Sequence, residues 1–368
     1  MTRIGSRDPQ KNRITSSAEQ GYGMKQRVKT ALRRIPPVRN LLERIGRLEK
    51  RQLDLTGELQ AARAELEDLR REMDYRHYRA LRPDHYEGEL RTWFERWSGT
   101  RLDLENPQTF NEKIQWLKLH DSSPIKTRLT DKYLVREWVR EKIGEKYLIP
   151  LLGVWEKFDD IDLDRLPDRF VLKANHGCGW NIVVKNKRTF DRAAAGRNFS
   201  RWLNTNFAFV NGLELHYKDI SPKIIAEELV ENEGGDLYDY KFWCFNGVPR
   251  FLALIAERHT GLKMSFYDLD WNRLPFGHSY PQYEKPVPRP GNLGEMIEVA
   301  KKLCRDFIYV RVDLYRLDDG SLRFGEMTFT TASGQCTWDP PEYDLMIGQM
   351  MALPDMENKP PRRARGRV

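Results

Sequence analysis

The sequence has 368 residues, of which 40 % are hydrophobic, so it is long enough for one or two domains with a sizeable core. Its net charge of +8 comes from its ends: residues 1–40 carry ten Lys/Arg against two Asp/Glu, and residues 357–368 carry five against one, which leaves residues 41–356 at −4. Nucleic-acid binding by the central part is therefore not supported, and no run reaches the ~20 apolar residues of a membrane-spanning helix.

The first segment, residues 1–37, is a basic arm. Residues 1–23 hold few large apolar side chains, so we expect them to be disordered. From Met24 to Ile35, basic residues alternate with apolar ones, which fits a short helix lying on anionic lipid; a solvated charged arm is the alternative. A second basic tail is predicted at residues 357–368. Four widely spaced cysteines favour a cytoplasmic protein. The N-terminal arm would then contact the inner face of the membrane.

Residues 38–75 follow a seven-residue repeat typical of a coiled coil. One core position holds Leu41, Leu48, Leu55, Ala62 and Leu69, and the other holds Val38, Ile45, Gln52, Leu59, Leu66 and Met73. In a parallel, in-register pair, the flanking positions would match Arg44 with Glu49, Glu58 with Arg63, and Glu65 with Arg70. The sequence therefore predicts a parallel homo-oligomer through residues 38–75. A helix packed on its own catalytic domain is the alternative.

Residues 76–356 alternate helical and strand patterns, which predicts a folded α+β domain. Helices are expected at 110–120 and 131–142. Strands are expected at 170–174, 181–185, 223–230, 240–245, 250–256, 309–317 and 322–328.

The segment from Val310 to Thr328 predicts a β-hairpin with chemistry on one face. If Asp319-Gly320 forms a two-residue turn, Asp313 lies opposite Glu326 and Arg311 opposite Thr328. Two opposed carboxylates repel each other unless a cation lies between them, and Mg²⁺ prefers such oxygen ligands. The hairpin therefore predicts a Mg²⁺ site beside a fixed cation. The alternative is a solvated sheet face.

Residues 170–184 predict a strand, a glycine loop and a second strand. Gly177 and Gly179 would let the loop backbone close on phosphate oxygens, and Lys173 precedes the loop. His176 is a candidate ligand, with a structural histidine as the alternative. Lys132, near a predicted helix start, and Lys241, on a strand among aromatic residues, are further candidate cations.

Together these motifs resemble the TupA-like ATP-grasp family of cell-surface polysaccharide biosynthesis. The resemblance covers about residues 106–348. It is carried by Thr109–Lys118, Asp131–Tyr133, Phe170–Trp180, Ile225–Leu229, Asp239–Phe242 and the Asp313–Thr328 hairpin. It implies an ATP-grasp fold, in which two α+β lobes with antiparallel sheets grip ATP. One departure is Thr328, where many ATP-grasp enzymes have Asn.

The resemblance also implies roles for individual residues. Lys132, Lys173 and Lys241 would bind phosphates under a flap formed by residues 175–180, which include His176, Gly177 and Gly179. The inter-lobe hinge that binds adenine would be Glu227, Glu228, Leu229 and Val230, with Asp236 and Asp239 near the ribose. Arg311 would face an acyl phosphate, and Asp313, Glu326 and Thr328 would hold Mg²⁺.

The implied function is an ATP- and Mg²⁺-dependent ligase that activates a carboxylate as an acyl phosphate and joins it to an amine. Cations that neutralise the transferring phosphoryl group would supply the main stabilisation, so no enzyme nucleophile is required. One alternative is a metal-dependent glycosyltransferase of polysaccharide biosynthesis, since a carboxylate pair can also hold a metal with a nucleotide sugar. Another is a non-catalytic assembly subunit.

Overall fold

The computed structural model describes residues 36–232, 237–257 and 261–354. The chain divides into two units, residues 1–73 and 74–368. The predicted basic arm up to Ile35 and the predicted tail at 357–368 lie outside the described residues. Within the described part, no helix combines the length and the apolar character needed to cross a membrane.

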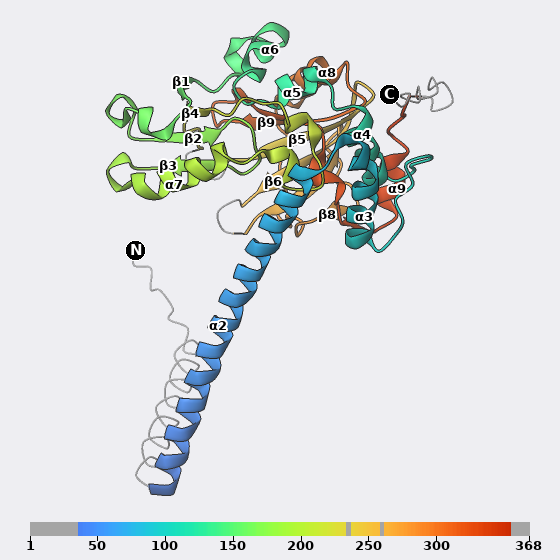
Figure 1. The fold of residues 1–368 in the computed structure, drawn as a ribbon. Coiled ribbons are helices and arrows are strands. Elements are labelled where there is room, and N and C mark those ends of the chain that lie inside the picture. The colour runs from blue at the N-terminus through green and yellow to red at the C-terminus, as the bar shows by residue number, and fades with distance from the viewer. Residues whose placement is uncertain (1–35, 233–236, 258–260, 355–368) are drawn as a thin grey trace, which may run out of the picture. The chain divides into compact units, whose positions relative to one another are not determined.

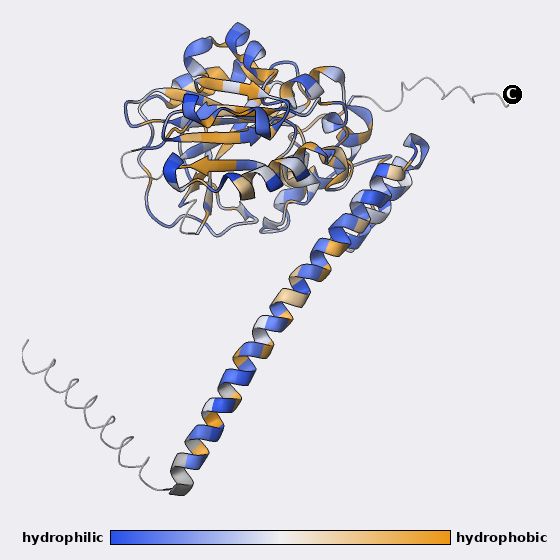
Figure 2. Cartoon of the chain, turned by 60° about the vertical axis from the view of Figure 1, so that its left-hand side comes forward, coloured by the Kyte–Doolittle hydropathy of each residue, from blue (hydrophilic) through white to orange (hydrophobic). Residues whose placement is uncertain are grey.

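The first unit contains most of α2 (Pro36–Ala80), a continuous helix of 45 residues. Apolar side chains recur along it as the heptad pattern predicts, visible as orange bands in Figure 2, and their exposed fractions run from 40 % at Ile45 to 70 % at Met73. The helical prediction is confirmed, whereas the coiled coil stays a prediction. The side chains of Val38 and Glu49 lie outside the described residues.

The second unit contains two larger antiparallel sheets (Figure 1), with the strand orders β1-β4-β2-β3 and β10-β9-β5-β6-β7, and a small β11-β8 pair. The first sheet consists of β1 (Leu151–Trp155), β2 (Phe170–Ala174), β3 (Asn181–Val184) and β4 (Ile224–Glu228). The second consists of β5 (Asp239–Phe245), β6 (Val248–Ala256), β7 (Lys263–Asp268), β9 (Tyr309–Arg316) and β10 (Leu322–Thr328). The small pair is β8 (Gly277–His278) and β11 (Trp338–Asp339).

Helices cover both faces of the five-stranded sheet and pack against the four-stranded one. They are α3 (Tyr86–Ser98), α4 (Phe110–His120), α5 (Pro124–Thr130), α6 (Val135–Lys142), α7 (Arg192–Leu203), α8 (Leu293–Cys304) and α9 (Tyr343–Gly348). On one face of the larger sheet, α8 packs against Phe242 and Val312. On its other face, α4 packs against Trp243 and Phe251. Helix α7 packs against Phe170 in the smaller sheet. This arrangement confirms the α+β prediction.

The seven predicted strands are all present, with ends that differ from the prediction by at most two residues. Helix α4 has the predicted bounds because a capping box fixes its start: the Thr109 side chain accepts a bond from the Glu112 amide, and Glu112 accepts one from the Thr109 amide. The start predicted for α6, at Asp131, is wrong by four residues. Asp131 is extended, and its carboxylate accepts bonds from the amides of Tyr133 and Leu134 instead.

The hairpin β9–β10 pairs Asp313 with Glu326 and Arg311 with Thr328, as predicted. The predicted two-residue turn is nevertheless wrong. The Leu317 amide donates to the Ser321 carbonyl over 2.9 Å, so the loop has three residues and ends at Gly320 with a φ of 81°. Near the loop the pairing is therefore shifted by one residue, and a bulge between Phe324 and Glu326 restores it.

Candidate functional site

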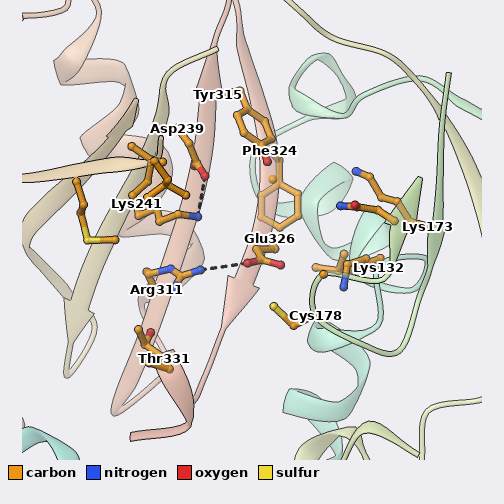
Figure 3. A pocket seen from close by; sticks show the side chains of 18 of the residues that line it. Lys132, Lys173, Cys178, Asp239, Lys241, Arg311, Tyr315, Phe324, Glu326 and Thr331 are labelled. Carbon is orange, nitrogen blue, oxygen red and sulfur yellow. Dashed lines mark hydrogen bonds and ion pairs between the residues drawn. The ribbon is translucent and has the colours of Figure 1, made fainter. Parts of the chain in front are cut away.

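A cavity of about 440 Å³ lies between the two larger sheets and receives side chains from both. Figure 3 shows Lys132 and Lys173 on one side and Lys241, Arg311 and Glu326 on the other. The lining also includes the apolar residues Val135, Leu148, Ile255, Leu262, Met264 and Phe324. The cavity thus combines opposed charged groups with apolar walls, as a site for an amphipathic ligand requires.

The wall formed by β5, β9 and β10 is organised around Asp313, of which 1 % is exposed. Arg311 donates to both of its carboxylate oxygens over 2.7 Å, from Nε and Nη2, and Lys241 also donates to it. Burial by itself would raise the pKa of Asp313, but Arg311 and Lys241 hold this pKa at about 2. Asp313 is therefore a buried anion that fixes two cations at the cavity wall.

Arg311 also joins the two carboxylates of the hairpin. Its Nη2 donates to Glu326 Oε1 over 3.1 Å, the contact drawn in Figure 3, and to Thr328 Oγ1 over 3.1 Å. Burial lowers the pKa of Arg311, but Asp313 and Glu326 raise it well above its usual range. The cation that the opposed carboxylates require is thus supplied by the Arg311 guanidinium, so their opposition alone does not require a metal ion, and the Mg²⁺ site stays a prediction.

The opposite wall carries cations held by Glu227, whose side chain is almost fully buried. Its Oε2 accepts a bond from Lys173 Nζ over 2.6 Å, and its Oε1 accepts one from Arg136 over 2.7 Å. Lys132 donates its Nζ to the carbonyl of Gly177 in the glycine loop. The acidic side chain thus orients cations toward the cavity.

The glycine loop between β2 and β3 is held in place by aromatic packing. Trp180 stacks parallel to Trp202 of α7, and a Cβ on Gly177 would lie 2.3 Å from the Trp180 ring. His176 is buried and uses both ring nitrogens, with Asn175 Oδ1 at 3.1 Å and the Trp202 carbonyl at 3.0 Å. Gly179, with a φ of 73°, lines the cavity, whereas His176 and Gly177 do not.

The predicted hinge starts at the end of β4. Glu228 donates its amide to the Pro150 carbonyl over 3.1 Å, and Leu229 and Val230 follow the strand. None of these three residues lines the cavity. Asp239, at the start of β5, does so and forms an ion pair of 2.7 Å with Lys241. Asp236 lies outside the described residues.

The family model for TupA-like ATP-grasp proteins matches residues 112–352, which is more than half of the chain. The chain belongs to this family. Its two antiparallel sheets with a cavity between them are accordingly those of the ATP-grasp fold. Among curated proteins, none matches this chain.

Several solved structures are similar to part of this chain. An N5-carboxyaminoimidazole ribonucleotide synthetase in complex with ADP is 10 % identical over 59 % of this chain and 50 % of its own length, with a TM-score of 0.36. A D-alanine–D-alanine ligase from Bacillus anthracis in complex with ATP is 15 % identical over 55 % of each chain, with a TM-score of 0.31. The chain thus spans about half the length of these two proteins. A D-cycloserine synthetase is 15 % identical over 64 % of this chain and 72 % of its own, with a TM-score of 0.34.

The oxygen ligands of Asp313, Glu326 and Thr328 suit Mg²⁺ chemically. Glu326 lines the cavity, and a third of its side chain is exposed. Asp313 lies behind Arg311 and Lys241, and its two oxygens bond to those cations. The described residues contain no group of three or more His, Cys, Asp or Glu side chains assembled for a metal. A metal at Asp313 would therefore share the carboxylate oxygens with these cations or displace one of them.

The structure brings eight of the predicted site residues of this ATP-grasp chain together in one cavity. They are Lys132, Lys173, Gly179, Glu227, Asp239, Lys241, Arg311 and Glu326. The lining residues that sequence reasoning missed include Arg136, His278, Ser279, Tyr280, Tyr315 and Thr331. Thr331 follows the hairpin directly and could have been found by extending that motif. His278 and Ser279 carry no local signal, since they reach the cavity through the β8–β11 pairing.

Proposed function

We propose that this chain is an ATP- and Mg²⁺-dependent ligase that activates a carboxylate as an acyl phosphate and joins it to an amine. The observation that carries the proposal is the convergence on one cavity of Lys132 and Lys173 from one side with Lys241, Arg311 and Glu326 from the other. Opposed cations of this kind suit the triphosphate of a nucleotide, and the family match supports the same chemistry.

In this mechanism the chain's own residues bind and orient the reacting groups. Lys132 and Lys173 would hold phosphate oxygens on one side, with Lys241 on the other. Arg311 lines the cavity and would orient the carboxylate and neutralise charge on the acyl phosphate. Bound Mg²⁺, at Glu326, Asp313 and Thr328, would supply further neutralisation of phosphate charge. The amine would attack the acyl carbon directly and displace inorganic phosphate with loss of a proton from nitrogen, so no enzyme nucleophile is needed.

Each cation that would meet phosphate already has a partner. Lys173 is paired with Glu227, Lys241 with Asp239 and Asp313, and Lys132 with a loop carbonyl. These contacts keep the cations in place at low cost, because burying unpaired charge is unfavourable. Binding of a nucleotide would therefore give these cations phosphate oxygens in exchange for some of their present partners.

We further propose that the reaction serves cell-surface polysaccharide biosynthesis in the cytoplasm, as the resemblance described in the sequence analysis implies. The substrates would be a carboxylate and an amine, at least one of them linked to a polysaccharide. This part of the proposal rests on the family match alone.

The decisive experiment measures ADP release from ATP and Mg²⁺ with a panel of carboxylates and amines. We expect Asp313→Asn to lower release about 100-fold, because it removes the anion that fixes Arg311 and Lys241 and a metal ligand. Asp319→Asn is the matched control: it lies in the exposed hairpin loop and should leave release unchanged.

Three outcomes would contradict the proposal. Equal ADP release by the wild type and Asp313→Asn would remove the assigned role of Asp313. Hydrolysis of a nucleotide sugar without binding of ATP would favour the glycosyltransferase instead. Absence of nucleotide binding altogether would favour a non-catalytic subunit.

A further inference from the structure

Helix α4 carries a buried polar stripe, although buried helix faces are usually apolar. Asn111, Gln115 and Lys118 are spaced by four and three residues and so lie on one face of the helix. Their exposed fractions are 2 %, 0 % and 0 %. The function proposed above assigns this stripe no role. Burying an amide or an ammonium group is costly unless its donors are bonded, so the partners of these groups decide what they do.

All three side chains bond to one turn that follows β10 and consists of residues 331–336. Gln115 Nε2 donates to the carbonyls of Ser333 and Gly334 over 3.1 and 3.0 Å. Lys118 Nζ donates to the Ser333 carbonyl over 2.8 Å and to Ser333 Oγ over 2.7 Å. Asn111 exchanges two bonds of 2.9 Å with the backbone of Cys336. The stripe therefore forms hydrogen bonds to residues 333, 334 and 336, mostly to their backbone atoms.

This turn has a backbone conformation that its residues do not favour. Ala332 and Ser333 have φ values of 49° and 54°, in the left-handed region that is unfavourable for residues other than Gly, Asn and Asp. Gly334 packs so closely on α4 that a Cβ there would lie 2.2 Å from Gln115 Nε2. The bonds from α4 offset the cost of this backbone, which would otherwise relax.

The same turn forms part of the cavity wall. Thr331 and Ala332 line the cavity, beside Arg311. The Thr331 hydroxyl lies 2.7 Å from the Tyr309 hydroxyl, and Thr330 donates to the buried carboxylate of Glu214. Lys118 has a further bond of 2.7 Å to the carbonyl of Gly212. The turn is thus fixed on several sides while two of its residues remain in contact with the cavity.

We propose that Asn111, Gln115 and Lys118 are positioning residues that hold the turn of residues 331–336 as the substrate-facing wall of the cavity. The proposal rests on the proposed ligase function for what the wall contacts, namely the carboxylate or the amine and not the nucleotide. The phosphate-facing lysines lie on other elements and do not bond to the turn. Loss of the stripe should therefore disturb the turn and leave nucleotide binding intact.

The energetic cost of burying Lys118 supports a positioning role for this residue. Burial lowers the pKa of Lys118 to about 7, although the nearby carboxylate of Glu214 opposes the shift. Three apolar side chains of similar size would bury this face of α4 without this cost, so the polar groups are best explained by the backbone that they fix.

The test compares two substitutions on the same helix. Lys118→Met removes the bonds to the turn, whereas Lys113→Met removes two similar bonds, of 2.9 and 2.7 Å, to the carbonyls of Gly348 and Met351, away from the cavity. In the full chain without ligand, we expect amide hydrogen exchange in residues 331–336 to become at least tenfold faster in Lys118→Met and to change less than threefold in Lys113→Met.

A second variant guards against misfolding, because Lys118→Met leaves Glu214 without its nearby cation. Gln115→Met removes two bonds to the turn without changing any charge and should accelerate exchange in the same residues. The affinity of each variant for ATP with Mg²⁺, measured by calorimetry, should stay within about threefold of the wild type. Unchanged amide exchange of residues 331–336 in folded Gln115→Met would overturn the proposal. Faster exchange accompanied by a loss of ATP affinity would also overturn it.

A rescue separates positioning from general stabilisation. Glycine adopts a positive φ without a steric cost, so Ala332→Gly should restore much of the ADP release that Lys118→Met loses. The same substitution should not raise ADP release in Lys113→Met. ADP release is measured with the carboxylate most active with the wild type, and a displaced wall should lower it about tenfold or more. An equal rise in ADP release on adding Ala332→Gly to Lys118→Met and to Lys113→Met would overturn the positioning role. Failure of the proposed function is distinguishable, since the wild type itself would then release no ADP while the exchange result would still decide whether the stripe holds the turn.

Discussion

Charged side chains in the core of this chain occur in sets that compensate one another. Asp313 bonds to Arg311 and Lys241, and Glu227 bonds to Lys173 and Arg136. Each carboxylate thereby orients two cations, which is the arrangement in which removal of one member leaves the others unpaired and costs most. At the residue scale, the site is therefore best probed by substitutions of its carboxylates.

His216 provides a prediction on pH at the residue scale. It is buried against the rings of Tyr217 and Phe329, and burial, together with Lys126 and Lys118, lowers its pKa to about 3. The folded pKa lies below the unfolded value of about 6.5, so the unfolded state binds more protons between these two values. Stability is therefore lost as the pH falls below 6.5.

We expect His216 to remove about 2 kcal/mol of unfolding free energy between pH 7 and pH 5. His216→Phe keeps an aromatic ring without the titration, so its stability should fall less over the same range. Urea unfolding of both proteins at the two pH values provides the measurement. An identical loss of stability in the two proteins would show that His216 does not titrate as described.

At the scale of elements, the hairpin β9–β10 depends on a glycine in its bulge. A Cβ on Gly325 would lie 3.1 Å from the Asp313 carbonyl and 3.2 Å from the Tyr315 ring, closer than ordinary contacts. The bulge restores the pairing of Asp313 with Glu326 after the three-residue loop has shifted it. Space at Gly325 thus keeps both carboxylates on the same side of the hairpin.

Gly325→Ala should therefore destabilise the second unit by about 1–2 kcal/mol and lower ADP release, since the Asp313–Glu326 register would be strained. The matched control is Gly294→Ala in α8, where a Cβ would meet nothing within 4 Å. That substitution should be neutral or stabilising by up to about 1 kcal/mol, because alanine favours helices. Urea unfolding distinguishes the two. Equal effects would show that the bulge tolerates a side chain.

At the scale of the whole molecule, we propose that α2 associates with second copies of itself in a parallel coiled coil. Leu48 and Leu55 lie on the heptad stripe and are more than half exposed, together with Leu41 and Leu69. Such a long exposed apolar stripe is costly in water and is removed by pairing. Peripheral membrane contact by residues 1–37 stays a prediction, because Met1–Ile35 lie outside the described part.

The double substitution Leu48→Glu/Leu55→Glu should convert the oligomer to a monomer, because it places like charges in the core of the coil. Leu53→Glu is the control: Leu53 is 73 % exposed but lies off the stripe, so the oligomer should persist. Analytical ultracentrifugation of the full chain measures both. A monomeric wild type would contradict the coiled coil.

The sequence by itself determined the features that depend on neighbouring residues. The helical heptads of α2, the bounds of α4 and the strand–loop–strand of residues 170–184 were all predicted, because the interactions that form them join residues a few positions apart. The opposition of Asp313 and Glu326 was also predicted, but from an incorrect turn that the unpredicted bulge happened to offset.

Tertiary structure alone decided which of these features meet. Asn111 bonds to Cys336 across 225 positions, and Lys173 bonds to Glu227 across 54, and no local pattern encodes such distances. The cavity likewise gained Thr331 and His278 only when the sheets and the small β8–β11 pair came together. Side-chain type and spacing fix local geometry, whereas the burial of charge and the partner of each buried donor are settled only by packing between distant segments.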